Sequence, residues 1–261
     1  MVFSPLKKNR RRRLLATPIP HEWVTYLRGN VALYESLTDL EQERLRNDLR
    51  VFIAEKNWEG CAGLTITDEI RVTIAAQACL LLLGVEHDYF SRVLSVLVYP
   101  ATYRNPREHI NRDGLLEEDR TGRVGEAWYR GPVVLAWDSV VKDARDPAVG
   151  RNVVLHEFAH QLDFLDGLAN GTPALKNQAQ RIEWHGVMTA AYEELIQDSE
   201  TGGVTFLDQY GATNPCEFFA VATEAFFTLP NQLQRRHPLL YKVLSEYYGQ
   251  HPAARIPRQE Q

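Results

Sequence analysis

Apolar residues recur at helical spacing along most of the chain, interrupted by short stretches with strand-like spacing. A capping box formed by Thr38 and Glu41 predicts a helix that runs to about Lys56. Further helices are predicted over about 67–84, 147–165, 178–196 and 215–228. The pattern therefore predicts a mainly helical chain.

Strand-like spacing appears first at 93–98, where Val and Leu residues dominate. Two further short strands are predicted at 125–128 and 132–137, just before the helix that begins near 147. A cluster of Gly, Asn and Pro residues at 167–173 predicts a surface loop and not a domain boundary. These elements together predict an α+β fold in which a small β-sheet lies beside the helices.

The N-terminus differs in character from the rest of the chain, because lysines and arginines cluster at 7–13. The apolar stretch that follows is too short for the core of a signal peptide, so we expect a basic mobile tail over 1–16. The remaining chain is expected to form a single domain over 17–255, followed by a short C-terminal tail at 256–261.

Composition narrows the range of partners and compartments. The formal net charge of −5 argues against nucleic acid as a direct partner, since phosphate neutralisation needs a clustered basic surface. The longest apolar run, 75–84, is too short to cross a bilayer, so no membrane span is expected. Cys61, Cys79 and Cys216 form a sparse, odd set without a CxxC pair, which indicates neither a disulfide framework nor a cysteine zinc site. We therefore expect a cytoplasmic protein.

The segment 153–160 reads VVLHEFAH and contains an HExxH motif. His156 and His160 stand four residues apart in an apolar helical pattern, so both imidazoles project from one face and can share one Zn²⁺ ion. Glu157 points about 100° around the helix, where it can deprotonate a water molecule without being a ligand. The motif predicts zinc-dependent peptide hydrolysis with Glu157 as general base. The alternative is a pair of buried histidines that bind no metal.

A catalytic zinc ion needs three protein ligands and one open position, and the third ligand has two candidate sources. Asp166 stands six residues after His160, where metzincin-like enzymes place their third ligand. Those enzymes need a glycine three residues after the second histidine, but Asp163 occupies that position and the glycine comes only at Gly167. This departure argues against Asp166.

The other source is the predicted helix at 215–228, whose surface is filled mainly by phenylalanine and alanine. Such a helix must be buried, and a buried carboxylate needs a cation or strong hydrogen-bond donors. Glu217 and Glu224 are two turns apart and share a face, so one can bind zinc while the other hydrogen-bonds a histidine.

The segment 210–220, which reads YGATNPCEFFA, is similar to the tyrosine and glutamate segment of anthrax lethal factor, a gluzincin-type protease. More of the chain resembles the bacterial Mlc titration factor A family, including 125–137, 156–163 and 226–251. The resemblance begins near Pro18 and leaves the basic tail uncovered.

This resemblance implies a zinc metallopeptidase with aminopeptidase-like activity that binds the glucose repressor Mlc and so influences sugar uptake. It implies one zinc ion per chain, held by His156, His160 and Glu217, with Glu157 as general base. Tyr210 matches the tyrosine thought to stabilise the oxyanion, and a phenol near the metal can donate such a hydrogen bond. Its alternative role is structural, as a tyrosine at the end of a loop.

One position departs from lethal factor, which has a further glutamate where this chain has Val221. The missing carboxylate leaves Glu224 or Asp163 to support the zinc ligands. Asp163 stands at helical spacing from both histidines, but it can equally serve as a capping or packing residue.

The sequence is compatible with two roles for the stretch before the zinc helix and with two functions for the chain. The stretch 131–137 can be an edge strand that pairs with an extended peptide substrate, or an ordinary buried strand. The rival to an enzyme is a regulatory protein that sequesters a transcriptional repressor and keeps a structural or vestigial zinc site. An intact Glu157 favours the enzyme, because a structural site has no use for a base beside its ligands.

Overall fold

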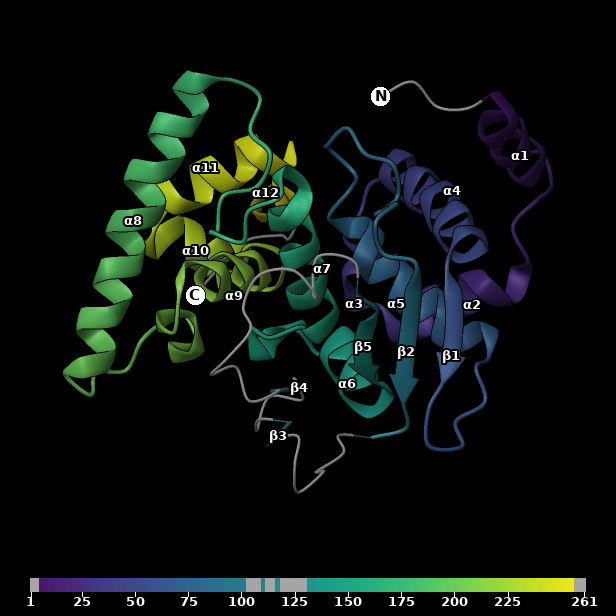
Figure 1. Cartoon of the computed structure of the whole chain (residues 1–261), viewed down its shortest axis with the longest axis horizontal. Helices are drawn as coiled ribbons and strands as arrows, with labels where there is room; N and C mark the ends of the chain where they lie inside the picture. Colours follow the sequence, from purple (N-terminus) through teal and green to yellow (C-terminus); the bar gives the residue numbers. More distant parts are fainter. Residues whose placement is uncertain (1–4, 102–108, 111–115, 118–130, 256–261) are drawn as a thin grey trace.

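The computed structural model describes residues 5–101, 109–110, 116–117 and 131–255 (Figure 1). Helices dominate these ranges, and in chain order the α-helices are α1 (Pro5–Leu15), α2 (His21–Asn30), α3 (Ala32–Glu35), α4 (Asp39–Glu55), α5 (Asp68–Leu80), α6 (Trp137–Arg145), α7 (Val153–Asp163), α8 (Gln178–Glu200), α9 (Pro215–Thr228), α10 (Pro230–Arg236), α11 (Pro238–Tyr248) and α12 (Pro252–Arg255). Short 3-10 turns occur at η2 (Pro147–Val149), η3 (Phe164–Asp166) and η4 (Gln209–Ala212).

A small parallel sheet lies beside the central helices and is ordered β1 (Asn57–Gly60), β2 (Ser95–Tyr99) and β5 (Val133–Ala136). β1 pairs with β2, and β2 with β5, in parallel, so all three strands run in the same direction. In this register Asn57 lies opposite Ser95 and Val96 opposite Val133. Parallel neighbours need a crossover, which α5 supplies between β1 and β2. A separate antiparallel pair joins β3 (His109–Ile110) to β4 (Leu116–Glu117).

The structure confirms a mainly helical α+β fold with a small sheet, and it corrects individual elements. The strands predicted at 93–98 and 132–137 are present as β2 and β5. Strand β1 was missed because its sequence, NWEG, lacks apolar alternation. Helix α6 was missed because it begins at Trp137, the last residue of a predicted strand. The predicted strand at 125–128 and the predicted tail at 256–261 lie outside the described residues.

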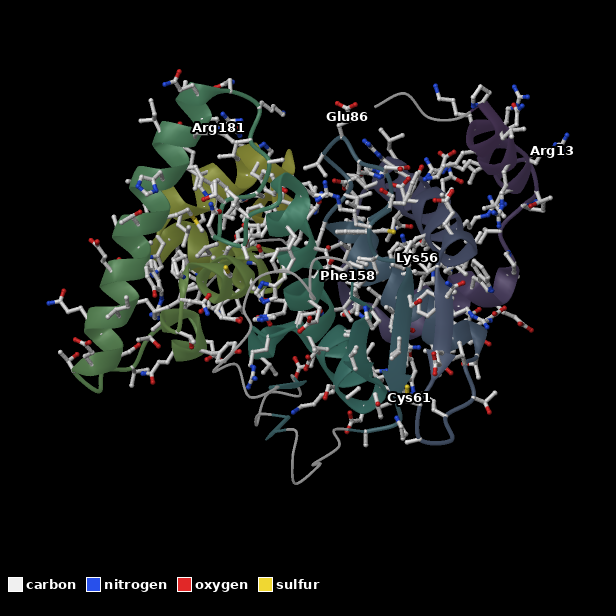
Figure 2. All side chains as sticks on the ribbon, viewed as in Figure 1. Arg13, Lys56, Cys61, Glu86, Phe158 and Arg181 are labelled. Atoms are coloured by element: carbon white, nitrogen blue, oxygen red, sulfur yellow. The ribbon has the colours of Figure 1, made fainter. Side chains whose placement is uncertain are left out.

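Helix α7 lies in the middle of the molecule, between the sheet with α4 and α5 on one side and the C-terminal helices on the other (Figure 1). Phe158 points into the first of these halves, where its ring is 5.6 Å from the ring of Phe52 and 4.8 Å from that of Phe90 (Figure 2). The helix predicted at 147–165 is divided by Gly150, which has a positive φ of 82° and ends η2. Helix α7 therefore starts only at Val153.

Helix α9 packs along α7 from the other side, and every residue from Glu217 to Thr228 is buried. Asn214 caps its start by accepting hydrogen bonds from the backbone N–H groups of Cys216 and Glu217, and Pro215 fits the first helical position. The predicted burial of this helix is confirmed. Although α9 is strongly apolar, no helix in the described ranges is long and apolar enough to cross a membrane.

The N-terminal basic residues form α1, which lies along α4 (Figure 1). Arg11 donates two hydrogen bonds of 2.7 Å to Glu55, forms an ion pair with Asp88, and lies 4.4 Å over the ring of Tyr89. Lys7 adds an ion pair of 3.0 Å with Asp88. The prediction of a mobile tail over 1–16 rested on the run of basic residues alone. The acidic partners of these residues lie far away along the chain, and only the fold brings them to α1.

Arg11 is expected to hold α1 in place, and Arg11→Ala should lower the free energy of unfolding by roughly 1.5–3 kcal/mol, the usual range for hydrogen bonds to charged groups. Arg13→Ala is the matched control, since Arg13 lies on the outer side of the same helix (Figure 2). Urea unfolding of both variants measures the difference. Equal losses in the two variants would contradict the role of Arg11.

Candidate metal centre

Helix α7 places His156 and His160 on one face, one turn apart. Their Nε2 atoms lie 3.2 Å from one another, and the ring planes are inclined by 82°. His156 is almost fully buried and His160 is partly buried, so the pair opens toward solvent on the His160 side. The two imidazole nitrogens converge on one point, as the HExxH spacing predicts.

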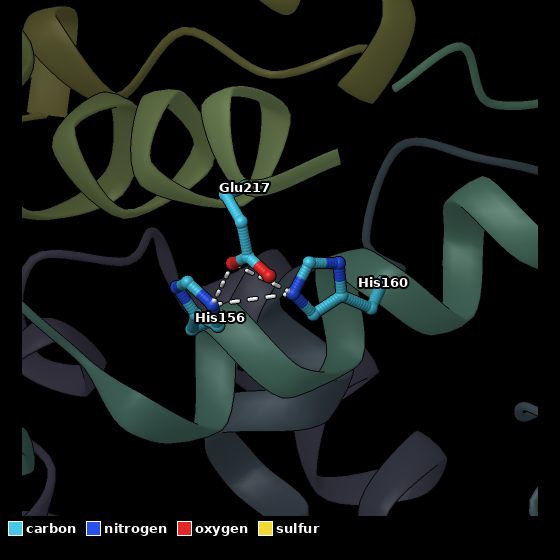
Figure 3. A group of neighbouring side chains, drawn as sticks. All are labelled: His156, His160 and Glu217. Carbon is cyan, nitrogen blue, oxygen red and sulfur yellow. Dashed lines mark hydrogen bonds and ion pairs between the residues drawn. The ribbon is translucent and has the colours of Figure 1, made fainter. Parts of the chain in front are cut away.

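Helix α9 brings a carboxylate to the same point (Figure 3). The Oε2 atom of Glu217 lies 3.0 Å from Nε2 of His156 and 3.3 Å from Nε2 of His160. Glu217 is 2 % exposed, so its charge is held inside the protein. One ligand atom from each of the three residues lies within 4.8 Å of the others, so among the described residues these three form a cluster that could hold a metal ion.

The chemistry of this cluster suits a cation. Burial alone would lower the pKa of His156, but hydrogen bonds to Glu217 and Glu224 raise it to about 10. Burial would likewise raise the pKa of Glu217, yet hydrogen bonds from the two histidines hold it far below its usual range. The pocket therefore stabilises positive charge beside a carboxylate. Two imidazole nitrogens and one carboxylate oxygen fit the donor set of a catalytic zinc ion, which leaves a fourth position open.

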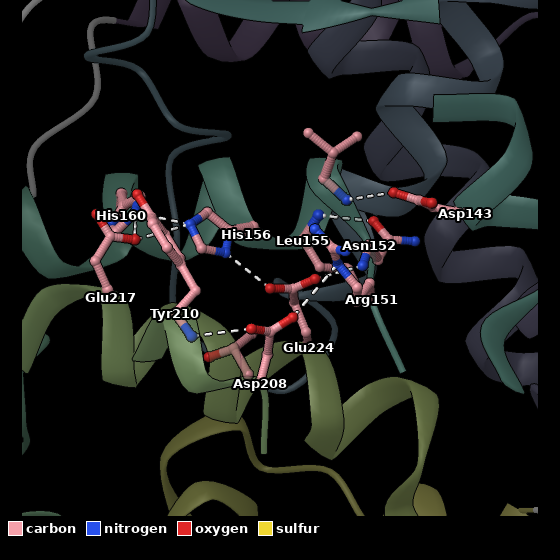
Figure 4. A network of polar contacts seen from close by, with 12 residues as sticks. Asp143, Arg151, Asn152, Leu155, His156, His160, Asp208, Tyr210, Glu217 and Glu224 are labelled. Atoms are coloured by element: carbon pink, nitrogen blue, oxygen red, sulfur yellow. Dashed lines mark hydrogen bonds and ion pairs between the residues drawn. The ribbon is translucent and has the colours of Figure 1, made fainter. Parts of the chain in front are cut away.

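Glu224 supports His156 from the opposite side of its ring (Figure 4). Nδ1 of His156 donates to Oε1 of Glu224 at 2.7 Å, and the other oxygen of Glu224 accepts a hydrogen bond from the backbone N–H of Asn152. A carboxylate only accepts, so Nδ1 of His156 carries a proton toward Glu224, and Nε2 is the ring atom that faces Glu217 and His160. Of the two candidates for this supporting role, Glu224 makes the contact.

Asp163 has a different set of partners. Its Oδ2 atom accepts a hydrogen bond of 2.9 Å from the backbone N–H of Gly171, and burial raises the pKa of its carboxyl group. Gly171 has a φ of +73°, and a side chain there would collide with the carbonyl oxygen of Pro215. Asp163 therefore holds the 167–173 loop against the start of α9. The structure does not describe the side chain of Asp166, the other candidate for the third ligand.

The two predicted catalytic residues lie beside the cluster. The ring of Tyr210, on η4, is 6.0 Å from the ring of His156 and runs toward the side where His160 and Glu217 converge (Figure 4). Asp208 fixes that turn by accepting a hydrogen bond of 2.9 Å from the Tyr210 backbone N–H. Glu157 follows His156 on α7, is half-buried, and its charge contributes to the raised pKa of His156.

Three further residues support the site and were not predicted. Asp143, on α6, accepts a hydrogen bond of 3.0 Å from the backbone N–H of Val153, while Asn152 and Gln77 hydrogen-bond each other at 2.7 Å. A polar recess lies on this side of His156, lined by Asp143, Arg151, Val153, His156, Asp208, Tyr210, Val221 and Glu224. Asn152 could have been found as an N-cap before the HExxH run, and Gln77 as the one polar residue within the apolar run 74–83.

An HExxH helix joined by a buried glutamate from a later helix defines a centre of the metallopeptidase class. Comparison with known proteins assigns the chain more closely. Residues 6–249 match the family described as Glucose-regulated metallo-peptidase M90, so this chain belongs to the M90 metallopeptidase family. Membership implies a peptide hydrolase, and the match includes most of α1, which the sequence resemblance left uncovered.

Individual relatives agree with this assignment. An uncharacterized protein of Synechocystis sp. is 39% identical over 245 residues, which are 93% of this chain and 89% of the relative. Mlc titration factor A of Escherichia fergusonii is 32% identical over 229 residues, covering 87% of this chain and 85% of the relative. The same-named protein of Yersinia pestis is 30% identical over 234 residues, covering 88% and 86%. The predicted resemblance to the Mlc titration factor A family is confirmed.

Glu217→Ala is expected to remove a metal ligand and to lower zinc affinity by more than roughly a hundredfold, beyond the loss typical of outer partners. Asp163→Asn is the matched control, because Asp163 holds a loop and should leave the zinc content stoichiometric. Elemental analysis of both purified variants measures the difference. Unchanged zinc in Glu217→Ala would move the third ligand to Asp166 or Glu224.

Proposed function

We propose that this protein is a zinc-dependent peptidase of the gluzincin type, with one Zn²⁺ ion held by His156, His160 and Glu217. The convergence of the HExxH histidines and Glu217 within one buried cluster carries the proposal. A continuous hydrophobic cluster from Leu27 to Tyr248 supports a single peptidase domain over 17–255. Three free cysteines fit the proposed cytoplasmic location.

A bound zinc ion would supply a Lewis acid that polarises the scissile carbonyl and lowers the pKa of the attacking water. The chain supplies the proton transfers and the positioning. Glu157 takes a proton from the attacking water and delivers it to the leaving amine. Tyr210 donates a hydrogen bond to the carbonyl oxygen as negative charge develops on it. Glu224 holds His156 in the tautomer that leaves Nε2 free to bind the ion.

The proposed substrate is a peptide, and the resemblance favours aminopeptidase-like cleavage. Strand β5 pairs with β2 on one side and, within the described residues, stands at the end of the sheet order. An extended peptide can add to such a strand through backbone hydrogen bonds. β5 also contacts α7, so a peptide bound there would run near the metal ligands.

A regulatory function is the second candidate, because relatives at about 30% identity carry the name Mlc titration factor A. We propose that an Mlc-like repressor is a partner of this chain and links it to sugar uptake. In the stricter alternative, the chain sequesters the repressor and the metal site is structural or vestigial. Glu157 in the HExxH motif, with Tyr210 beside the ligands, supports the enzyme over this alternative.

Glu157→Gln should keep stoichiometric zinc and lose peptidase activity by roughly 10²–10⁴-fold, the usual contribution of general acid–base catalysis. Elemental analysis and cleavage of aminoacyl and short-peptide reporters test both parts. Glu193→Gln, an exposed change on α8, is the control that should retain both. Full activity in Glu157→Gln would remove Glu157 from the mechanism, and zinc without turnover in the wild type would favour the regulatory protein.

Tyr210→Phe should reduce kcat by roughly 10²–10³-fold, the cost of losing one oxyanion donor, with little change in KM. The matched control is Tyr192→Phe, because the Tyr192 hydroxyl also bonds the η4 turn, donating to the carbonyl oxygen of Ala212 at 3.3 Å. Steady-state kinetics on one reporter separate the two variants. If both lose activity equally, Tyr210 acts through the turn and not on the substrate.

A further inference from the structure

We infer that Gln77 and Asn152 are positioning residues of the metal centre, which set the orientation of Glu224 and through it that of His156. The inference rests on the proposed function, because it concerns how well the site holds a zinc ion. Its evidence is a continuous series of hydrogen bonds that runs from α5 through the start of α7 to α9. No atom of Gln77 needs to approach the metal for this effect.

The series starts at Glu224, whose two oxygens have different partners. One oxygen accepts from Nδ1 of His156 at 2.7 Å, and the other accepts from the backbone N–H of Asn152. Glu224 is only 7 % exposed, so few water molecules can substitute for either partner. The direction in which the carboxylate points is therefore tied to the backbone position of Asn152.

Asn152 is held at both ends of its side-chain amide. Its Oδ1 atom caps α7 by accepting from the backbone N–H of Leu155 at 2.9 Å, and its Nδ2 group donates to Oε1 of Gln77 at 2.7 Å. The capping oxygen must be an acceptor, so the amide cannot be reversed without losing both bonds. Asn152 is 1 % exposed, and each bond is made away from water.

Gln77 completes the series on α5. Its Nε2 group donates to the backbone carbonyl of Thr73 at 2.9 Å, which leaves Oε1 to accept from Asn152. The side chain is completely buried, and placing an amide there costs free energy unless it is hydrogen-bonded. Thr73 is itself held, since its hydroxyl accepts from Nδ2 of Asn30 at 3.1 Å. The amide of Gln77 therefore makes both hydrogen bonds in one orientation only, and Thr73, which accepts one of them, is itself held in place.

These contacts tie three helices to one imidazole ring. α5 supplies Gln77, α7 supplies His156 and is capped by Asn152, and α9 supplies Glu224. Losing the Gln77–Asn152 bond would leave a buried amide unpaired and free the start of α7 to shift. Glu224 would then hold His156 less well, and the ring would spend less time oriented for metal binding. Groups that orient metal ligands in this way tune metal affinity.

The test compares zinc affinity of the full-length protein and its variants, measured by competition between metal-stripped protein and a chelating dye for Zn²⁺. Gln77→Leu removes the acceptor, and Asn152→Ser removes the donor while keeping a good helix cap. We expect each to weaken zinc binding roughly tenfold, the lower end for outer partners of metal ligands. Because both break the same bond, the double variant should lose little more than either alone.

Thr223→Val is the matched control, since Thr223 precedes Glu224 on α9 and makes a buried hydrogen bond of 2.8 Å with the Tyr248 hydroxyl. Like Gln77→Leu, it should lower the stability of the metal-free protein, but unlike that variant it should keep wild-type zinc affinity. Unchanged affinity in Gln77→Leu or Asn152→Ser, or an equal loss in Thr223→Val, would overturn the inference. A wild type that binds no zinc would overturn the proposed function and the inference together.

Discussion

The burial of the Glu217 carboxylate is the constraint on which the centre of this protein depends. A carboxylate that is removed from water needs compensating charge or donors, and here the two histidines of α7 provide both. Helix α9 must therefore face α7 with one particular side. The apolar residues that fill the rest of α9 hold it against that helix, so the hydrophobic core and the metal cluster specify the same packing.

The start of α7 meets this constraint from the other end. The first backbone N–H groups of a helix lack partners within it, and acceptors from other elements satisfy them here. Asp143 comes from α6, Glu224 from α9 and the Asn152 side chain from the cap itself. Acidic groups at this end also interact favourably with the helix dipole. The start of α7 is thus fixed by three acceptors, and this fixes the position of the histidines that follow.

Much of this arrangement was predictable from local sequence. The spacing of His156 and His160 places both on one helix face, and the resemblance identified Glu217 as their partner, a convergence that the structure shows. The sequence could not decide between Glu224 and Asp163, because both stand at suitable helical positions and only the packing of α9 shows which one reaches a histidine.

Other features depend on contacts between distant parts of the chain. Gln77 gave only a weak signal, a lone polar residue in an apolar run, since its partner Asn152 lies 75 positions away. The docking of α1 was missed for the same reason, because Glu55 and Asp88 become partners of Arg11 only in the folded chain. Strand β1 has too little apolar pattern to be recognised without its neighbour β2.

Glu217 and Glu224 contact the same imidazole ring of His156 from opposite edges, one at Nε2 and the other at Nδ1. Both belong to one buried helix, so the ring cannot turn while that helix stays in place. The ring therefore has little rotational freedom left to lose when an ion binds, which lowers the entropic cost of forming the centre.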